Sequence, residues 1–296
     1  MIAKIRALRF GLRGQGIVPF VLILPPVLIV AGVMGYGVVV ALISSFQELN
    51  VMSVSQGFVG FANYLELFRD ARFLNSLVRT LILAAGTVAL GVVVSLSAAL
   101  LLSRVVALRK SLNALALIPW LVSAVAVAMM FRFMFVGNAG LANNVLQRLG
   151  LEPVWWFVSP ALTTMVLVVA VTWYIAPLST IVLVGGLTTI DQHLYESAQL
   201  DGASKPRMFV SITLPLIRPM MRVSLIWLTF ASFNQFDVVL PATGGGPGRS
   251  TEVMALLMYR LAFDGFDFSA AYAITVLLMA MNILAGLGYT ILFRER

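Results

Sequence analysis

Long apolar runs separated by short polar segments are the main pattern along this chain. Each run is long enough for a membrane-spanning helix, which needs about 20 mostly apolar residues. A membrane-spanning β-strand needs only about 10 residues of alternating polarity, and these runs do not alternate. The pattern predicts an all-α polytopic membrane protein whose six transmembrane helices form one domain over 17–293, at roughly 17–43, 77–102, 112–136, 161–187, 214–236 and 268–293.

The composition agrees with this interpretation. Hydrophobic residues make up 60% of the 296 positions and charged residues 11%, and the mean hydropathy is +0.99. One water-soluble core cannot bury so much apolar surface, so the chain is expected in a lipid bilayer. Cysteine is absent, which excludes disulfides, thiolate metal sites and a cysteine nucleophile. The segments between the runs are too short for a soluble catalytic domain.

The net charge of +8 would suggest nucleic acid as the partner of a soluble protein, but its distribution indicates a membrane orientation. Basic residues gather in alternate segments, whereas 44–76, 137–160 and 237–267 are close to neutral or negative. By the positive-inside rule, residues 1–16 and the tail 294–296 are expected on the cytoplasmic side, and no nucleic acid is expected as a partner. The basic residues of the cytoplasmic side are Lys4, Arg6, Arg9, Arg13, Arg104, Arg109, Lys110, Lys205, Arg207, Arg218, Arg222, Arg294 and Arg296.

The start of the chain allows two interpretations. Residues 2–13 mix apolar and basic side chains, so they either lie along the membrane surface or form a solvated basic start. A basic segment before an apolar run also resembles a signal peptide, but no short apolar region ends at a small-residue cleavage site. The first run is therefore interpreted as a retained helix.

The predicted outer segments contain local structure signals. Residues 61–68 place aromatic and leucine side chains at helical spacing, which predicts a short interfacial helix. Residues 137–140 indicate a turn, and Trp155 and Trp156 are typical of the aromatic belt at a membrane interface. The glycine-rich segment 241–248 lacks the Gly-Lys-Ser/Thr ending and the preceding strand of a phosphate-binding loop, so a tight turn is predicted there.

Residues 195–221 form the longest polar stretch on the predicted cytoplasmic side. Thr189 and Gln192 fit a capping box, which predicts a helix from there to Asp201. Gly202 suits a left-handed turn at the end of that helix, and Ser204 can cap a second helix that bends into the fifth span. The result is a helical hairpin over 189–213 that presents small side chains, namely Ser197, Ala198 and Ala203.

Two hypotheses describe this hairpin: it docks into a groove of a partner protein, or it only joins two spans. A catalytic acid pair is excluded, because Glu196 and Asp201 are five positions apart and so about 140° apart around a helix. Pairing of these acids with a partner's arginine is the more plausible role. The sole histidine, His193, has no companion ligand in the segment, so no metal site is expected.

The hairpin resembles the cytoplasmic loop signature of bacterial ABC importer permeases, which reads Glu-Ala-Ala, two residues, Asp-Gly-Ala, and further on Ile-x-Leu-Pro. The matching segments are 196–198, 201–203 and 212–215, and Ser197 departs from the usual alanine by one small residue for another. The resemblance implies that this hairpin is the coupling helix that sits in a cleft of a cytoplasmic ATPase. Its coupling residues would be Glu196, Ser197, Ala198, Asp201, Gly202 and Ala203.

Further segments resemble the carbohydrate-type permeases, specifically the first permease subunit of maltose, trehalose and glycerol 3-phosphate uptake systems. These are Pro25-Pro26, Phe61-Ala62-Asn63-Tyr64, Leu117-Ile118-Pro119-Trp120, Phe233-Asn234-Gln235-Phe236-Asp237 and Thr243 to Gly248. The resemblance implies the fold of a type I ABC importer permease. It also implies four partners besides the bilayer: a second homologous permease, two copies of a cytoplasmic ATP-binding subunit, and an extracytoplasmic solute-binding protein.

The energy for transport would come from those partners. The sequence contains no Gly-x4-Gly-Lys-Ser/Thr motif, so the chain itself is expected not to hydrolyse ATP and not to bind a cofactor. ATP and Mg²⁺ would be used by the partner subunits. Their closure would push on residues 195–203 and move the helices between inward-open and outward-open states, which is alternating access.

Polar residues inside apolar spans are the candidates for a solute pathway, because each costs free energy in lipid unless it faces a wet cavity. Sugars bind to aromatic faces together with amide and hydroxyl groups. Serine and threonine in spans can instead bond to their own helix or pack between helices. Thr172 is one candidate, and the others are Trp120, Ser123, Trp173, Tyr174, Thr180, Ser232, Asn234 and Gln235.

Arg132 is the one charge that lies well inside a predicted span. It either extends to lipid headgroups or binds an anion or gates the pathway. If it faces the cavity, an anionic solute such as glycerol 3-phosphate becomes the alternative to a neutral sugar, whereas Asp237 at the end of the fifth run favours the neutral solute.

Two other classes of protein are less consistent with the sequence. An ion-coupled secondary transporter needs buried ionisable residues near the midplane, and the first, fourth and sixth runs contain none. A membrane-embedded enzyme needs convergent acids, histidines or a nucleophile and base, which the runs also lack.

Overall fold

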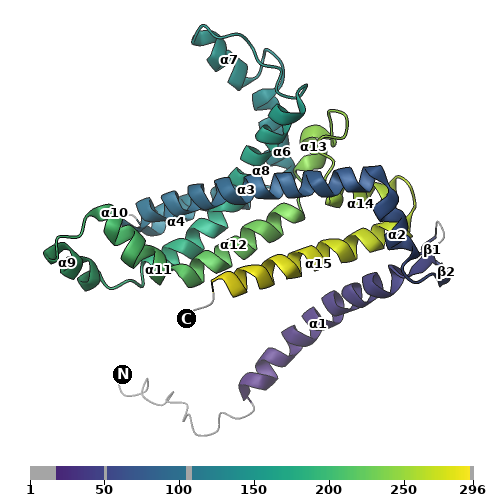
Figure 1. The fold of residues 1–296 in the computed structure, drawn as a ribbon, viewed down its shortest axis with the longest axis horizontal. Helices are drawn as coiled ribbons and strands as arrows, with labels where there is room; N and C mark the ends of the chain where they lie inside the picture. The colour runs from purple at the N-terminus through teal and green to yellow at the C-terminus, as the bar shows by residue number, and fades with distance from the viewer. Residues whose placement is uncertain (1–17, 50–51, 105–108, 294–296) are drawn as a thin grey trace, which may run out of the picture.

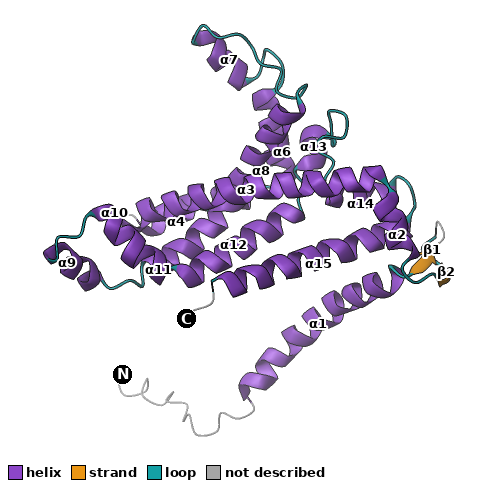
Figure 2. Cartoon of the chain, in the orientation of Figure 1, coloured by secondary structure: helices purple, strands orange, loops and turns teal. Residues whose placement is uncertain are grey.

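The computed structural model describes residues 18–49, 52–104 and 109–293. Its regular structure is helical apart from one two-stranded hairpin among those residues, as Figures 1 and 2 show, which confirms the predicted all-α class. The predictions for residues 1–16 and 294–296 fall outside the described residues. The elements are α1 Val18–Ser44, β1 Gln47–Leu49, β2 Ser55–Phe58, α2 Ala62–Arg69, α3 Ala71–Arg104, α4 Arg109–Ala116, α5 Ile118–Leu121, α6 Ala124–Phe135, α7 Leu141–Arg148, α8 Pro160–Leu187, α9 Gln192–Leu200, α10 Lys205–Met208, a π-helical turn Phe209–Thr213, α11 Leu214–Leu216, α12 Arg218–Phe233, α13 Val239–Thr243, α14 Met254–Phe263 and α15 Phe268–Leu292.

Long apolar helices follow the predicted spans in most places. α1, α3, α8 and α15 are each long and apolar enough to cross a membrane, and they coincide with the first, second, fourth and sixth predicted runs. The fifth run is a bent pair, in which Lys205–Leu216 meets α12 at 73°. By length and composition, the described residues therefore hold four spanning helices, or five if the bent pair counts as one span, rather than the six predicted.

The third predicted span is not one continuous helix. It is divided into α4, α5 and α6, with Pro119 in the first turn of α5, where the missing N–H group of proline is tolerated. Val122 and Ser123 have extended backbone, with ψ of 142° and 135°, and separate α5 from α6. Hydropathy cannot reveal such a break, because the segment stays apolar on both sides of it.

Two prolines produce the bend before α12. Pro215 lies in α11 and Pro219 in the first turn of α12, and neither can donate a backbone hydrogen bond. Ile217 between them leaves the helical region, with φ of −90° and ψ of 4°. The predicted bend into the fifth span is therefore confirmed, and α12 begins at Arg218 rather than at residue 214.

Small residues along α3 allow its neighbours to approach closely. α3 packs along α8 and α12, and its buried face includes Ala84, Gly91 and Ser95. A Cβ atom on Gly91 would lie 3.0 Å from Leu228 of α12, so a larger residue would push the helices apart. The hydrophobic core formed around this contact also includes α6, α14 and α15.

α1 lies apart from this core. It touches α15 and β1, but its apolar side chains, such as Val33 and Tyr36, are exposed. A helix that is apolar all round is covered by lipid or by another chain. In Figure 1, α9 to α11 lie at one end of the bundle and α2 with the β-hairpin at the other, as their predicted opposite sides require.

The first outer loop contains the predicted interfacial helix as α2, together with a β-hairpin that the sequence did not predict. β1 and β2 are antiparallel and are three and four residues long. Asn63 of α2 donates to the carbonyls of Ser45 and Gln47 at 2.8 and 3.0 Å, which ties the helix to the end of α1 and to β1. Such short strands carry little hydrophobic periodicity, so the pattern could not reveal them.

Candidate functional site: the cytoplasmic hairpin and the polar residues of the spans

The hairpin helix α9 begins two residues later than the capping box predicts. Asp191 is the N-cap, and its carboxylate accepts from the backbone N–H of His193 at 3.0 Å. Thr189 instead donates its hydroxyl to the carbonyl of Gly186 in the last turn of α8. The capping box at Thr189 is therefore wrong, because a hydroxyl that is still within reach of the preceding helix bonds back to it.

The end of α9 agrees with the prediction. Gly202 has a φ of +77°, in the left-handed region that glycine favours. The N–H of Ala203 donates to the carbonyl of Ala198 at 2.9 Å and the N–H of Gly202 to that of Gln199 at 3.0 Å, which together form a Schellman motif. Ser204 occupies the predicted N-cap position of α10, without a side-chain capping bond.

The surface of α9 is open. None of its residues is buried, and two leucines extend from it, with Leu194 47% and Leu200 89% exposed. The carboxylate of Glu196 lies 3.1 Å from Nδ1 of His193, and Asp201 is the C-cap, so the two acids do not converge. The side chains that could contact a partner are therefore a mixture of apolar and hydrogen-bonding groups.

One side-chain contact attaches α9 to the next part of the chain. The hydroxyls of Tyr195 and Thr213 share a hydrogen bond of 2.8 Å. Thr213 is the last residue of the π turn and is 4% exposed. The sequence reasoning missed this pair, since the two residues are 18 positions apart and neither belongs to the predicted coupling set.

The predicted pathway residues fall on helices that touch one another. α8 contacts α5, α6 and α12, and Trp173 of α8 packs edge-on against Phe131 of α6, with ring centroids 6.0 Å apart. Tyr174 is partly buried against the core. Four of the residues are exposed in the isolated chain: Trp120, Ser123, Trp173 and Asn234.

The hydroxyls of Thr180 and Ser232 are used within their own helices. Thr180 donates to the carbonyl of Ala176, and Ser232 donates to that of Leu228. This is the back-bonded arrangement that formed the alternative to a pathway role. A role of these two residues in the pathway stays a prediction.

The amides at the end of α12 differ from each other. Asn234 is exposed, and its amide nitrogen donates to the carbonyl of Phe230 at 2.8 Å. Gln235 is 7% exposed, and its amide oxygen has no hydrogen-bond partner. The buried hydroxyl of Thr172 also has none. Buried polar atoms usually have a partner. Among the pathway candidates, Gln235 and Thr172 are the two that have a buried oxygen without a partner in the described part of the chain.

A charge cluster that the sequence reasoning missed lies on the predicted outer side. Glu252 is fully buried, and its carboxylate accepts two bonds from Arg72 of α3, at 2.7 and 3.1 Å, and one from Arg260 of α14, at 2.7 Å. Burial alone would raise the pKa of Glu252, but the hydrogen bonds from Arg72 and Arg260 outweigh it, and the pKa lies below its ordinary value. Arg260 also donates to the carbonyl of Gly244. The glycine turn is thereby held to two helices.

The loop around α7 is organised by one buried amide. Asn143 donates to the carbonyls of Gly137 and Val154 and accepts from the N–H of Val154 and from Nε1 of Trp156, all within 3.0 Å. Trp156 also packs edge-on against Phe135. Of the two predicted belt tryptophans, Trp155 is 61% exposed, while Trp156 is part of the interior of this loop.

A family model shows what this architecture is. The family described as the binding-protein-dependent transport system inner membrane component matches residues 91–296, which is more than half of the chain. The chain belongs to this family. It is therefore a multi-pass component of the inner membrane with the fold of an ABC importer permease, as the resemblance implied.

Relatives support the same assignment. The chain is 31% identical over 288 residues to the sulfoquinovosyl glycerol transport system permease protein SmoG of Agrobacterium fabrum, covering 96% of this chain and 92% of that protein. It is 37% identical over 220 residues to the trehalose/maltose transport system permease protein MalF of Thermococcus litoralis, covering 74% of each. A crystal structure of a bacterial ABC transporter involved in the import of the acidic polysaccharide alginate has a chain with a TM-score of 0.78 and 24% identity, covering 93% of this chain and 94% of that one.

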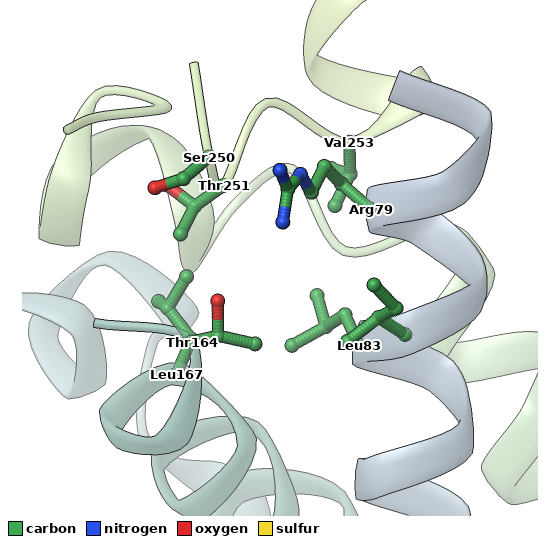
Figure 3. A pocket seen from close by; sticks show the side chains of 8 residues that line it. Arg79, Leu83, Thr164, Leu167, Ser250, Thr251 and Val253 are labelled. Carbon is green, nitrogen blue, oxygen red and sulfur yellow. The ribbon is translucent and has the colours of Figure 1, made fainter. Parts of the chain in front are cut away.

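Two arginines of this inner membrane component lie in helices near the predicted outer side. Arg132 is exposed and donates to the carbonyl of Pro241 at 3.1 Å, a contact that neither of its two interpretations included. Arg79 lies two turns into α3, so Arg132 is not the one charge within a span. Figure 3 shows Arg79 facing Thr164 of α8 across a small pocket, whose lining includes Ser250 but none of the predicted pathway residues.

Proposed function

We propose that this chain is the permease subunit of an ATP-driven, binding-protein-dependent importer that moves a sugar, polyol or oligosaccharide across the cytoplasmic membrane by alternating access. The single observation that carries the proposal is the exposed hairpin with its family signature, at the end of the bundle where the predicted cytoplasmic charges lie. The printed names of SmoG and MalF support a carbohydrate-related solute.

In this proposal α9 docks into a cleft of a cytoplasmic ATPase. Leu194 and Leu200 offer apolar surface that no described residue covers fully, and Glu196 can pair with a partner's arginine. The Schellman motif at Gly202 ends α9 and forms the turn that leads into α10. A push on α9 then reaches α12 through the helical segment Lys205–Leu216.

The solute pathway is proposed to form between this chain and a second, homologous permease. Trp120, Ser123, Trp173 and Asn234 are exposed in the single chain although they lie in apolar helices or at their ends, which fits a surface that faces a wet, shared cavity. Two ATP-binding subunits and an external solute-binding protein complete the proposed assembly. The aromatic, hydroxyl and amide groups are uncharged, so we favour a neutral sugar over an anionic solute such as glycerol 3-phosphate.

The test is Glu196→Lys in the complete transporter, reconstituted in proteoliposomes and assayed with labelled trehalose, maltose and glycerol 3-phosphate. Charge reversal on α9 should abolish ATP-dependent uptake while the chain still inserts and assembles with its partners. Glu152→Lys, at an exposed acid on the opposite side of the predicted membrane, is the matched control and should retain uptake. Normal uptake by Glu196→Lys would refute the coupling role, and uptake that needs a proton gradient instead of ATP would refute the importer class.

A further inference from the structure

The attachment of α9 to its base is unusually sparse. Its nine residues include no buried one. Among the described residues, the side-chain hydrogen bonds of α9 stay within its own first turns, with one exception. That exception is the 2.8 Å bond between the hydroxyls of Tyr195 and Thr213. Without it, α9 would be held through its two connecting turns alone.

Thr213 is well placed to receive a force. It closes the π turn, and its carbonyl accepts from the N–H of Ile217 at 3.1 Å, at the point where the chain bends into α12. The next residue but one, Pro215, cannot donate a backbone bond, so the helix is locally weakened just beyond Thr213. π turns within helices often occur at functional positions. Tyr195 thus bonds to the last residue of the π turn, four positions before Ile217, where the backbone leaves the helical region.

The side chain of Tyr195 is suited to hold α9 at a fixed distance from the π turn. A tyrosine has two rotatable side-chain bonds and a rigid ring, so its hydroxyl is held at a fixed reach with little loss of conformational entropy. Tyr195 is half-buried and Thr213 is almost fully buried, which limits competition from water for this bond.

We propose that Tyr195 and Thr213 are a positioning pair: their hydrogen bond fixes the angle of α9 on the segment 205–216, so that movement of the ATPase moves α12 instead of tilting α9. This inference rests on the proposed coupling function of the hairpin. Neither residue touches solute or nucleotide in this proposal. The pair determines how much of the motion is transmitted, and therefore how much solute is moved for each ATP hydrolysed.

The test is Tyr195→Phe in the complete transporter, with uptake and ATP hydrolysis measured in the same proteoliposomes and with whichever of labelled trehalose, maltose or glycerol 3-phosphate the unmodified transporter accepts. Uptake per ATP should fall about two- to tenfold, the range that corresponds to one hydrogen bond between neutral groups. ATP hydrolysis itself should be kept or raised, because the nucleotide sites are unchanged. Thr213→Val should have the same effect, and Thr213→Ser, which keeps the hydroxyl, should restore the ratio.

The chain supplies a matched control. Thr229 of α12 and Tyr289 of α15 form another hydroxyl pair at 2.9 Å, inside the bundle, and Thr229 is 5% exposed, much like Thr213. Tyr289→Phe removes the same chemical group at the same kind of contact, but outside the hairpin. It should leave uptake per ATP unchanged, so a loss in both variants would indicate a general packing effect and overturn the proposal.

A double variant gives the sharpest result. Tyr195→Phe with Thr213→Val should be no worse than either single change, since both remove one bond. Additive losses, or an unchanged ratio in all three variants, would overturn the positioning role. If Glu196→Lys abolishes uptake while Tyr195→Phe is neutral, the pair is refuted and the coupling function stands. If Glu196→Lys is neutral, the coupling function itself fails.

Discussion

Two short helices, α7 and α9, end in the same way and are anchored in opposite ways. Gly150 after α7 has a φ of +75° and Gly202 after α9 a φ of +77°. Both are followed by the same pair of Schellman bonds, since Leu151 donates to Leu146 just as Ala203 donates to Ala198. The local sequence therefore sets the same helix end twice.

α7 and α9 differ in how they are anchored to the rest of the chain. α7 contributes Asn143 to the interior of its loop. The side chain of Asn143 is 1% exposed, and its amide donates two hydrogen bonds and accepts two. Among the described residues, α9 contributes no buried residue and makes one side-chain hydrogen bond to another element. Glu252, also on the predicted outer side, is likewise buried with its polar groups paired, to two arginines. The polar groups of α7 and Glu252 bond within the chain and hold their loops in place. Most polar groups of α9 are exposed and could bond to a partner.

The largest expected effect is on the outer side, at Glu252. Glu252→Ala leaves Arg72 and Arg260 partly buried without their acid, which should destabilise the chain by about 3–5 kcal/mol. The midpoint of thermal unfolding in detergent measures this. Arg249→Ala is the control, because its contact with Glu252 is 3.9 Å long and exposed, and it should cost about 1 kcal/mol or less.

The pH dependence checks the same contact. The pKa of Glu252 is lower in the folded state than its unfolded value of about 4.3. Its stabilisation is therefore fully present above the unfolded pKa and is lost as the pH falls through the folded pKa. The unmodified chain should lose thermal stability more steeply below about pH 4.3 than Glu252→Gln does. Equal slopes would show that the acid contributes no favourable interaction.

The next effect is at Asn143. Asn143→Ala leaves the N–H of Val154 and the indole N–H of Trp156 without their acceptor, at a cost of about 1–3 kcal/mol for each group that water does not reach. Hydrogen exchange across 137–156 should speed up accordingly. Asn144→Ala, at the exposed neighbour, should change exchange much less, and equal effects would mean that α7 is no better anchored than α9.

The comparison is most direct at the two glycines. Gly202→Pro and Gly150→Pro each remove an N–H that donates at 3.0 Å and force a positive φ to a negative one. The local loss of stability, measured by hydrogen exchange at each helix end, should be similar. Uptake should be abolished by Gly202→Pro alone, because only that turn lies in the proposed coupling path. Loss of uptake in both variants with assembly intact would show that the outer turn also takes part.

The end of α9 and the turn after it could be predicted from sequence, but the division of the third predicted span into three helices could not. The backbone conformation at Gly202 and Ser204 depends on a few neighbouring residues. The predicted end of α9 and start of α10 were therefore right. The division of 112–136 into three helices depends on the extended backbone at Val122 and Ser123, which leaves hydropathy unchanged. Thr189 was assigned to the wrong helix because its hydroxyl could reach either one.

The sequence by itself determined the membrane class, the apolar runs, the hairpin and the family resemblance, because hydropathy, charge bias and short motifs act over neighbouring residues. Only the tertiary structure decided which polar groups meet. Glu252 lies 180 positions from Arg72, and Tyr195 lies 18 from Thr213. Such pairs arise from how helices pack and bend, and no local pattern encodes the distance between them.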